Sequence, residues 1–208
     1  MENLLAQIKR DGIITFTIRV LNFILRKTIG FVWRTEIIYE CSLEIPIQEI
    51  EPKIKVTTRE AAEKDLEKFK EIVNERKIEL FRGRFKKDRI CFIALDKKEI
   101  AYFGWISFED EYETNCQIRV KVKDKEAYWF DCYTIPEYRH NGLHGAITIK
   151  ALIYLKDKGC KKVLTLVMKN NIYSRKAFRK VGFKEKKMVT LIKIFNFKHY
   201  IYRDIKGK

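Results

Sequence analysis

Apolar residues recur with a helical period early in the chain and with a strand period further on. Within residues 59–74 the apolar side chains share one side of a helix: Ala62, Leu66, Phe69, Ile72 and Val73. Thr58 has a side chain suited to cap that helix. A shorter helix is expected at residues 78–85, and residues 89–95 and 99–108 are expected to form a hairpin through a polar turn.

The second half of the chain combines further strands with two helices. The expected elements are strands at 116–122, 128–135, 163–168 and 188–197 and helices at 146–158 and 171–180. Gly159 ends the longer helix, and Asn171 caps the shorter one, which ends at Gly182. The order of elements predicts a mixed α/β (α+β) fold with a central sheet flanked by helices.

The pattern of apolar and basic residues in the first 50 positions differs from that of the rest of the chain. On a helical wheel, residues 12–33 and Arg34 gather basic side chains on one side, which is typical of an amphipathic helix, although residues 14–20 also alternate like a strand. Residues 35–46 favour a strand. We expect an N-terminal amphipathic helical or strand extension at residues 1–50 and a main domain at residues 51–208, whose first strand covers 53–57.

Two interpretations of residues 12–33 stay open. One is peripheral contact with a membrane surface. The other is a helix packed on its own domain or on a second copy, as in a homodimer. A membrane span is not expected, because no charge-free run approaches the required ~18–20 residues. A signal peptide is not expected either, because acidic residues interrupt this segment and no cleavage site follows.

The formal net charge is +16, and most of the excess follows Lys156. Such a field attracts anions, but no RNA-binding aromatic signature or zinc-finger spacing is present, so no nucleic-acid partner is expected. Five scattered cysteines indicate neither a disulfide framework nor a metal site. We therefore expect a protein of the reducing cytoplasm without a bound metal.

Residues 136–146 carry the strongest chemical signal: Pro-Glu-Tyr-Arg-His-Asn-Gly-Leu-His-Gly-Ala. They follow a strand-like run and precede a helix-like run. A glycine-containing turn that opens a helix leaves backbone amides without partners, and the helix N-terminus adds roughly half a positive charge. This arrangement predicts a site for an anion such as a phosphate.

The same residues resemble the pyrophosphate-binding motif of the GNAT acyltransferase superfamily, through Arg139-x-x-Gly142. His144 stands where that motif has Gly or Ala, and a side chain there would narrow the site. A second match follows at the expected distance, through Asn171, Ser174, Phe178 and Gly182-Phe183. The resemblance, from about Lys53 to Phe195, implies a mixed, mostly antiparallel sheet with a splay near the loop.

The resemblance also implies the binding of acetyl-CoA (coenzyme A). The strand before the loop would hold the pantetheine arm, and the amide of Thr134 would polarise the thioester carbonyl. The loop would hold the pyrophosphate, while Asn171 and Ser174 would line the cofactor channel. The implied cofactor-binding residues are Tyr133, Thr134, Ile135, Arg139, His140, Asn141, Gly142, Leu143, His144, Gly145, Asn171, Ser174 and Phe178.

The catalytic acid and base are less evident. The family's usual acid, a tyrosine on the last short helix, aligns with Phe178, which cannot donate a proton, and Tyr173 lies more than a turn away. The candidate catalytic residues are Tyr128, at a usual base position, and Asp131, the carboxylate of that strand. Asp131 could equally pair with a nearby cation, and a β-bulge would change its direction.

We therefore expect an N-acetyltransferase that transfers acetyl from acetyl-CoA to an amine of a small acceptor by direct attack. The acceptor would meet the sheet beside Trp105, Tyr128 and the acidic residues 109–111, which would favour a cationic amine unless that loop is only a solvated turn. The alternative is a GNAT-like protein that binds coenzyme A without catalysis, as a regulator or scaffold.

Overall fold

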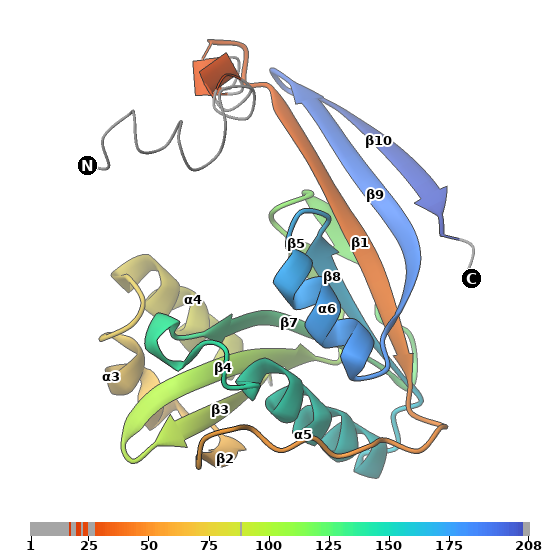
Figure 1. The fold of residues 1–208 in the computed structure, drawn as a ribbon. Helices are drawn as coiled ribbons and strands as arrows, with labels where there is room; N and C mark the ends of the chain where they lie inside the picture. The colour runs from red at the N-terminus through yellow and green to blue at the C-terminus, as the bar shows by residue number, and fades with distance from the viewer. Residues whose placement is uncertain (1–16, 18–19, 22, 25–27, 88, 206–208) are drawn as a thin grey trace.

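The computed structural model describes residues 17, 20–21, 23–24, 28–87 and 89–205. Within them, an eight-stranded sheet forms the centre of the molecule (Figure 1). In spatial order its strands are β10 (Phe197–Asp204), β9 (Lys184–Ile194), β1 (Val32–Ser42), β8 (Lys162–Met168), β7 (Glu126–Thr134), β4 (Glu99–Ser107), β3 (Ile90–Asp96) and β2 (Thr57–Glu60). All neighbours are antiparallel except β7 and β8, which are parallel. The expected mixed, mostly antiparallel sheet is confirmed.

Helices cover both faces of this sheet. On one face, α5 (Leu143–Asp157) and α6 (Ile172–Lys180) close a core with β1, β7 and β8. On the other, α3 (Leu66–Phe69), α4 (Glu75–Phe85) and the small hairpin of β5 (Glu111–Glu113) and β6 (Ile118–Val120) close a second core. The second core is mainly aromatic: the ring of Phe81 packs against Phe69, Phe103 and Trp105 at centroid distances of 5.0–5.5 Å.

Strand β1 lies inside the sheet although its residues belong to the expected N-terminal extension. It pairs with β8 along Glu36–Ser42 and with β9 along Val32–Glu40. Ile37, Tyr39 and Cys41 all point into the core beneath α5 and α6, which is the alternation typical of a strand covered on one face. Residues far apart in the sequence therefore build this half of the sheet.

The elements expected at residues 53–57, 59–74 and 188–197 differ in the structure. The helix expected at residues 59–74 is wrong: β2 covers Thr57–Glu60, instead of the strand expected at 53–57, and a 3-10 turn at Glu63–Asp65 precedes the short α3. The buried carboxylate of Asp65 accepts two 2.7 Å hydrogen bonds from Arg59 and one of 2.9 Å from the amide of Ala62. This local bonding competes with a continuous helix.

The C-terminal strand expected at residues 188–197 is really two strands. Strand β9 ends at Ile194, and β10 pairs back along it after a two-residue turn in which Phe195 has φ +51°. A tight hairpin requires positive φ, but phenylalanine gives no sequence signal for it. Half of residues 12–33 lie outside the described part of the chain. The described residues among 17–28 are helical and Val32 and Trp33 belong to β1, while the expected amphipathic character of the segment stays a prediction. In the described part, no helix combines the length and hydropathy needed to cross a membrane.

Candidate active site

The segment after β7 turns sharply before α5 begins. Residues Pro136–Tyr138 form a 3-10 turn, His140 has φ +67° and Gly142 has φ +77°. Both angles lie in the left-handed region, which glycine adopts without steric cost. Because Gly142 is also the N-cap of α5, the turn leads directly into the first turn of a largely buried helix.

The backbone amides of residues 140–145 donate to no acceptor in the described part of the chain. The first amide of α5 with a partner is that of Ala146, which donates to the carbonyl of Gly142 over 3.1 Å. These unpaired donors lie at the positive end of the helix, where phosphate groups bind in many proteins. The loop therefore has the geometry expected of an anion site.

Several contacts hold this loop in place. The amide of Lys53 donates to the carbonyl of Asn141 over 2.8 Å, and the Asn141 side chain donates back to the carbonyls of Tyr138 and Arg139 over 3.3 Å each. Nε of Arg139 donates to the carbonyl of Thr134 over 3.3 Å. The amides of the loop are thus positioned before any ligand arrives.

His144 points into the core and does not narrow the loop. Its Nδ1 lies 2.9 Å from Oη of Tyr102, and its ring meets Phe178 edge-on with the centroids 4.7 Å apart. Burial lowers the pKa of this imidazole to about 4, so it is neutral at neutral pH. The part of His144 that is available to an anion at the loop is its backbone amide.

A gap opens between β7 and β8 next to this loop. The two strands pair through only Glu126–Tyr128 and Lys162–Leu164. Beyond that point β7 continues with β4 while β8 continues with β1, and the two halves of the sheet diverge (Figure 1). The splay expected near the loop is therefore present.

The edge of β7 that faces the gap has no pairing with β8 beyond Tyr128. The amide of Ile135 donates to the carbonyl of Ala101 in β4 over 3.0 Å. Because successive amides along a strand point in opposite directions, the amide of Thr134 points away from β4, toward the gap. This is the amide expected to polarise a thioester carbonyl.

Helix α6 lies beside the loop. Oδ1 of Asn171 accepts from the amide of Ser174 over 3.1 Å, so Asn171 caps the helix as expected. Phe178 is buried, with 3% of its surface exposed, while Tyr173 is 81% exposed and its ring lies 6.4 Å from that of His140 in the loop. The second sequence motif is thereby brought against the first.

A model of the acetyltransferase (GNAT) family matches residues 56–183. The chain belongs to this family. Similar solved structures include a GCN5-related N-acetyltransferase from Sphaerobacter thermophilus (TM-score 0.59, 14% identity, 88% of this chain and 57% of that one). A GNAT-family acetyltransferase from Colwellia psychrerythraea is also similar (TM-score 0.57, 12% identity, 79% of this chain and 57% of that one).

The aminoglycoside acetyltransferase AAC(6')-Iy, solved with a bisubstrate analogue that contains coenzyme A, has a TM-score of 0.51 at 18% identity over 64% of this chain and 92% of that one. At such identities the likeness concerns the fold. The present chain spans little more than half of the two longer relatives. No curated protein matches it.

In this GNAT chain Asp131 lies at a β-bulge in β7. Phe103 of β4 pairs with Tyr133 and Trp105 with Phe130, so Asp131 and Cys132 together oppose one residue of β4. Asp131 has φ +47°, and its carboxylate reaches α4, where it pairs with Lys77 (2.9 Å) and Arg84 (2.6 Å). Both carboxylate oxygens therefore have cationic partners.

The surroundings of Tyr128 and Cys132 disfavour the ionised form of both side chains. Tyr128 is 1% exposed, and its hydroxyl donates to Oε2 of Glu113 over 3.1 Å. Burial, together with the Glu113 charge, raises the pKa of this phenol well above its usual range. Burial also raises the pKa of the Cys132 thiol, which does not favour a thiolate nucleophile.

The acidic loop at residues 109–111 is largely neutralised. Arg89 pairs with both Glu109 and Glu111, and Asp110 pairs with Lys121 over 2.7 Å and accepts from the amide of Val122. Two cations thus balance most of the charge of its three carboxylates, which reduces the attraction of this loop for a cationic acceptor.

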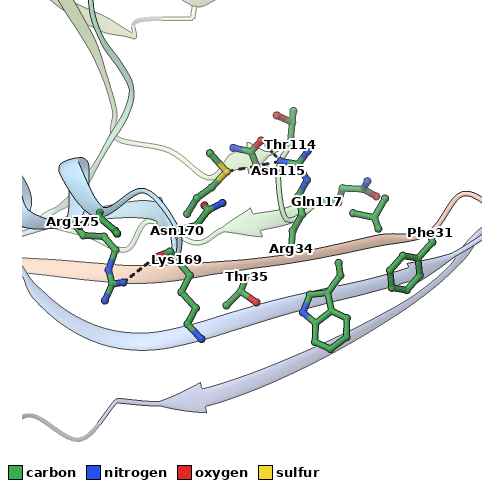
Figure 2. A pocket seen from close by; sticks show the side chains of 13 residues that line it. Phe31, Arg34, Thr35, Thr114, Asn115, Gln117, Lys169, Asn170 and Arg175 are labelled. Atoms are coloured by element: carbon green, nitrogen blue, oxygen red, sulfur yellow. Dashed lines mark hydrogen bonds between the residues drawn. The ribbon is translucent and has the colours of Figure 1, made fainter. Parts of the chain in front are cut away.

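The structure also reveals a pocket that the sequence did not indicate. A cavity of about 850 Å³ lies between the start of β1, the β5–β6 turn and the segment after β8 (Figure 2). Arg34 of β1 lies in its wall, and the next side chain on the same face, Glu36, is buried behind it with Oε1 unpaired. In the sequence, the only indication of this pocket was the pair of charged residues, Arg34 and Glu36, at alternate positions of a strand. Their place beside the pocket follows from the pairing of β1 with β8.

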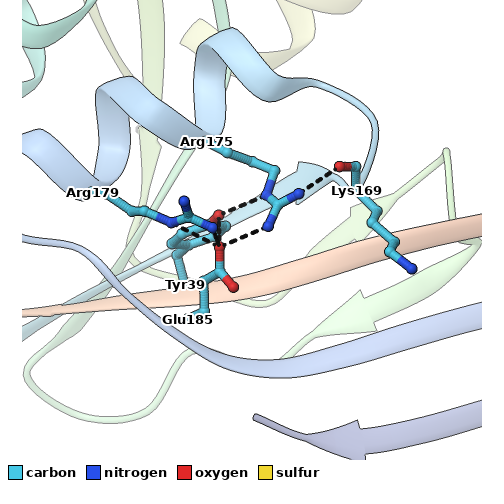
Figure 3. Close-up of polar contacts among 5 residues, drawn as sticks. All are labelled: Tyr39, Lys169, Arg175, Arg179 and Glu185. Atoms are coloured by element: carbon cyan, nitrogen blue, oxygen red, sulfur yellow. Dashed lines mark hydrogen bonds and ion pairs between the residues drawn. The ribbon is translucent and has the colours of Figure 1, made fainter. Parts of the chain in front are cut away.

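A polar network fastens α6 over β1 and β9 (Figure 3). Oε1 of Glu185 accepts from the hydroxyl of Tyr39 over 2.5 Å, from Nη2 of Arg175 over 3.1 Å and from Nε of Arg179 over 3.0 Å. Burial opposes ionisation of Glu185, but these donors outweigh it and lower its pKa. Arg175 also donates to the carbonyl of Lys169 over 2.9 Å, which orders the pocket wall.

Proposed function

We propose that this GNAT protein is an N-acetyltransferase that uses acetyl-CoA and a small amine acceptor. The observation that carries the proposal is the run of unpaired amides at residues 140–145, beside the free edge of β7. Those donors match the diphosphate of coenzyme A in charge and in hydrogen-bonding chemistry. The basic C-terminal quarter of the chain adds an attractive field. Acetyl-CoA would supply an activated acyl group as a thioester.

The residues of the chain would mainly bind the cofactor, orient it toward the acceptor and polarise its thioester carbonyl. Residues 140–145 would hold the diphosphate, and the free edge of β7 would align the pantetheine arm. The amide of Thr134 would donate to the carbonyl oxygen as negative charge develops on it, which favours the transition state over the ground state. Orientation of two reactants can itself contribute several powers of ten in rate.

The binding step is tested by thermal unfolding with ligands. Acetyl-CoA should raise the melting temperature, whereas free acetate should not. Gly142→Val should abolish that rise because it places a branched side chain in the loop. Gly159→Val is the matched control, since Gly159 also has positive φ (+83°) but lies at the far end of α5 with no atom near an added Cβ. An unchanged rise in Gly142→Val would refute the loop assignment.

A second candidate is coenzyme A binding without catalysis, and Phe178 favours it. This residue stands where many family members have a proton-donating tyrosine, and it is buried against His144 and Phe183. Release of free thiol from acetyl-CoA, measured across an amine library, separates the two candidates. Tight cofactor binding without thiol release above the rate of hydrolysis would favour the binding role.

A further inference from the structure

The pocket of Figure 2 is built from three segments that lie far apart in the sequence. Its walls come from residues 31–35, residues 114–117 and residues 168–175. Met168 is the last residue of β8, the strand that borders the gap, and Asn170 precedes the cap of α6. The pocket therefore adjoins the gap proposed for the thioester.

All charged side chains that line this pocket are cationic: Arg34, Lys169 and Arg175. Arg175 has a carboxylate partner in Glu185. Within the described residues, the hydrogen-bond partners of the Arg34 guanidinium are neutral: Oδ1 of Asn115 at 3.4 Å and Sδ of Met168 at 4.0 Å. Among residues 28–87 and 89–205, neither Arg34 nor Lys169 takes part in an ion pair.

Neighbouring carboxylates do not cancel this charge at the pocket surface. Glu36 is 1% exposed and interacts electrostatically with Arg34, but burial raises its pKa to about 7, so below that pH it carries little charge. Glu113 accepts from the hydroxyl of Tyr128 and from the amide of Asn115 over 3.1 Å each. The loop at 109–111 is paired with Arg89 and Lys121. Arg34, which forms no ion pair in the described residues, therefore faces a cavity that the side chains of Asn115 and Gln117 also line, whereas Lys169 points to the opposite side of β1 (Figure 2).

We propose that the acceptor is an amine that also carries an anionic group, a carboxylate or a phosphate, which Arg34 binds. This rests on the proposed acetyltransferase function. The anionic group would sit in the pocket while the amine nitrogen reaches the gap. There the nitrogen forms a bond to the acyl carbon, the carbon–sulfur bond breaks, and the proton lost by the amine passes through solvent to the departing thiolate. A guanidinium suits either anion, because it offers paired donors in a fixed fork.

The test compares acceptors that differ in one anionic group. Binding of phosphoethanolamine against ethanolamine, and of glycine against glycinamide, is measured by calorimetry with and without coenzyme A. Acetyl transfer to the same four compounds is measured in parallel. The anionic member of at least one pair should bind about tenfold or more tightly, as a charge-assisted hydrogen bond implies. The pair that shows the difference identifies a phosphate or a carboxylate as the preferred anion.

Variants connect any such preference to the pocket. Arg34→Gln should remove it, Arg34→Lys should retain part of it, and Arg203→Gln is the matched control because that exposed arginine lies on β10, outside the pocket wall. Equal binding within both pairs, no binding of either anionic amine, or equal losses in Arg34→Gln and Arg203→Gln would each overturn the proposal. If coenzyme A fails to bind, the acetyltransferase function fails, yet an Arg34-dependent preference measured without it would still support the anion site.

Discussion

Oη of Tyr102 lies 2.9 Å from Nδ1 of His144, and this contact joins β4 to the first turn of α5. Nε2 of the same imidazole has no partner in the described part of the chain. The helix that begins at the anion loop is therefore fastened to the sheet by a neutral, partly buried histidine. A protonated ring would carry a hydrogen on both nitrogens, and the one on Nε2 would have no acceptor in the described residues.

Protonation of His144 at acidic pH should consequently lower the free energy of unfolding. Its folded pKa, about 4, lies below the ordinary value of 6.5, so the unfolded state binds the proton first. The stability it contributes is complete above pH 6.5 and is lost as the pH falls toward 4, by at most about 3 kcal/mol. Denaturant unfolding between pH 7 and 4 should show this slope in the native sequence and a flatter one in His144→Leu. Identical slopes would contradict the prediction.

Glu36 should produce the opposite trend over an overlapping range. Burial, with a smaller effect from the charge of Glu113, raises its pKa from 4.5 to about 7. Here the folded state binds the proton first, so stability is greatest below pH 4.5 and falls as the pH rises through 7, by at most about 3 kcal/mol. Glu36→Gln should therefore be more stable than the native protein at pH 8 and similar to it at pH 5. Chemical denaturation at both values checks this, and a loss of stability at pH 8 would count against it.

Two glycines should respond in opposite ways to the same substitution. A Cβ on Gly104 would lie 2.5 Å from the buried indole of Trp129, whereas a Cβ on Gly83 in α4 would meet nothing within 4 Å. Gly104→Ala should cost about 1–3 kcal/mol or more through overpacking. Gly83→Ala should add up to about 1 kcal/mol, because alanine favours a helix interior. Melting temperatures of the two variants would decide the matter, and a neutral Gly104→Ala would show that Trp129 can move.

The parts of the fold that were predicted correctly depend on neighbouring residues. The hairpin of β3 and β4, helix α5 and the capped helix α6 follow from periodicity and from Gly159 and Asn171. The turn before α5 follows from Gly142 in the same way. Each of these signals lies within a few residues of the structure that it determines, so a single sequence suffices to find it.

The remainder depends on contacts between residues that are distant in the sequence. The position of β1 inside the sheet is determined by its pairing with β8 and β9. The same pairing determines where Arg34 and Glu36 lie. The helix expected at 59–74 was wrong partly because residues 57–60 pair with β3 as a strand. A bulge that directs Asp131 to Lys77 likewise depends on β4. Such effects are set by tertiary packing, which overrides local propensity.

The role of Asp131 can be decided because its two interpretations predict different losses. Its carboxylate is held by Lys77 at 2.9 Å and Arg84 at 2.6 Å, and Arg84 also lies 4.7 Å from the ring centroid of Phe130. We expect Asp131→Asn to lower the free energy of unfolding by about 1–3 kcal/mol, because two partly buried cations lose their partner. Since α4 and β7 would still be joined by the aromatic core, kcat should fall less than tenfold.

Lys77→Met is the matched variant, since it breaks one of the same pairs from the other side. A structural role predicts that both variants lose stability and that both keep most of their activity at saturating acceptor. A general base predicts a different result: kcat falls about 10²–10⁴-fold in Asp131→Asn alone, with the acidic limb of the pH–rate profile removed. That second pattern would establish Asp131 as catalytic. The first would show that this bulge carries a carboxylate in order to hold α4 against the strand that presents Thr134.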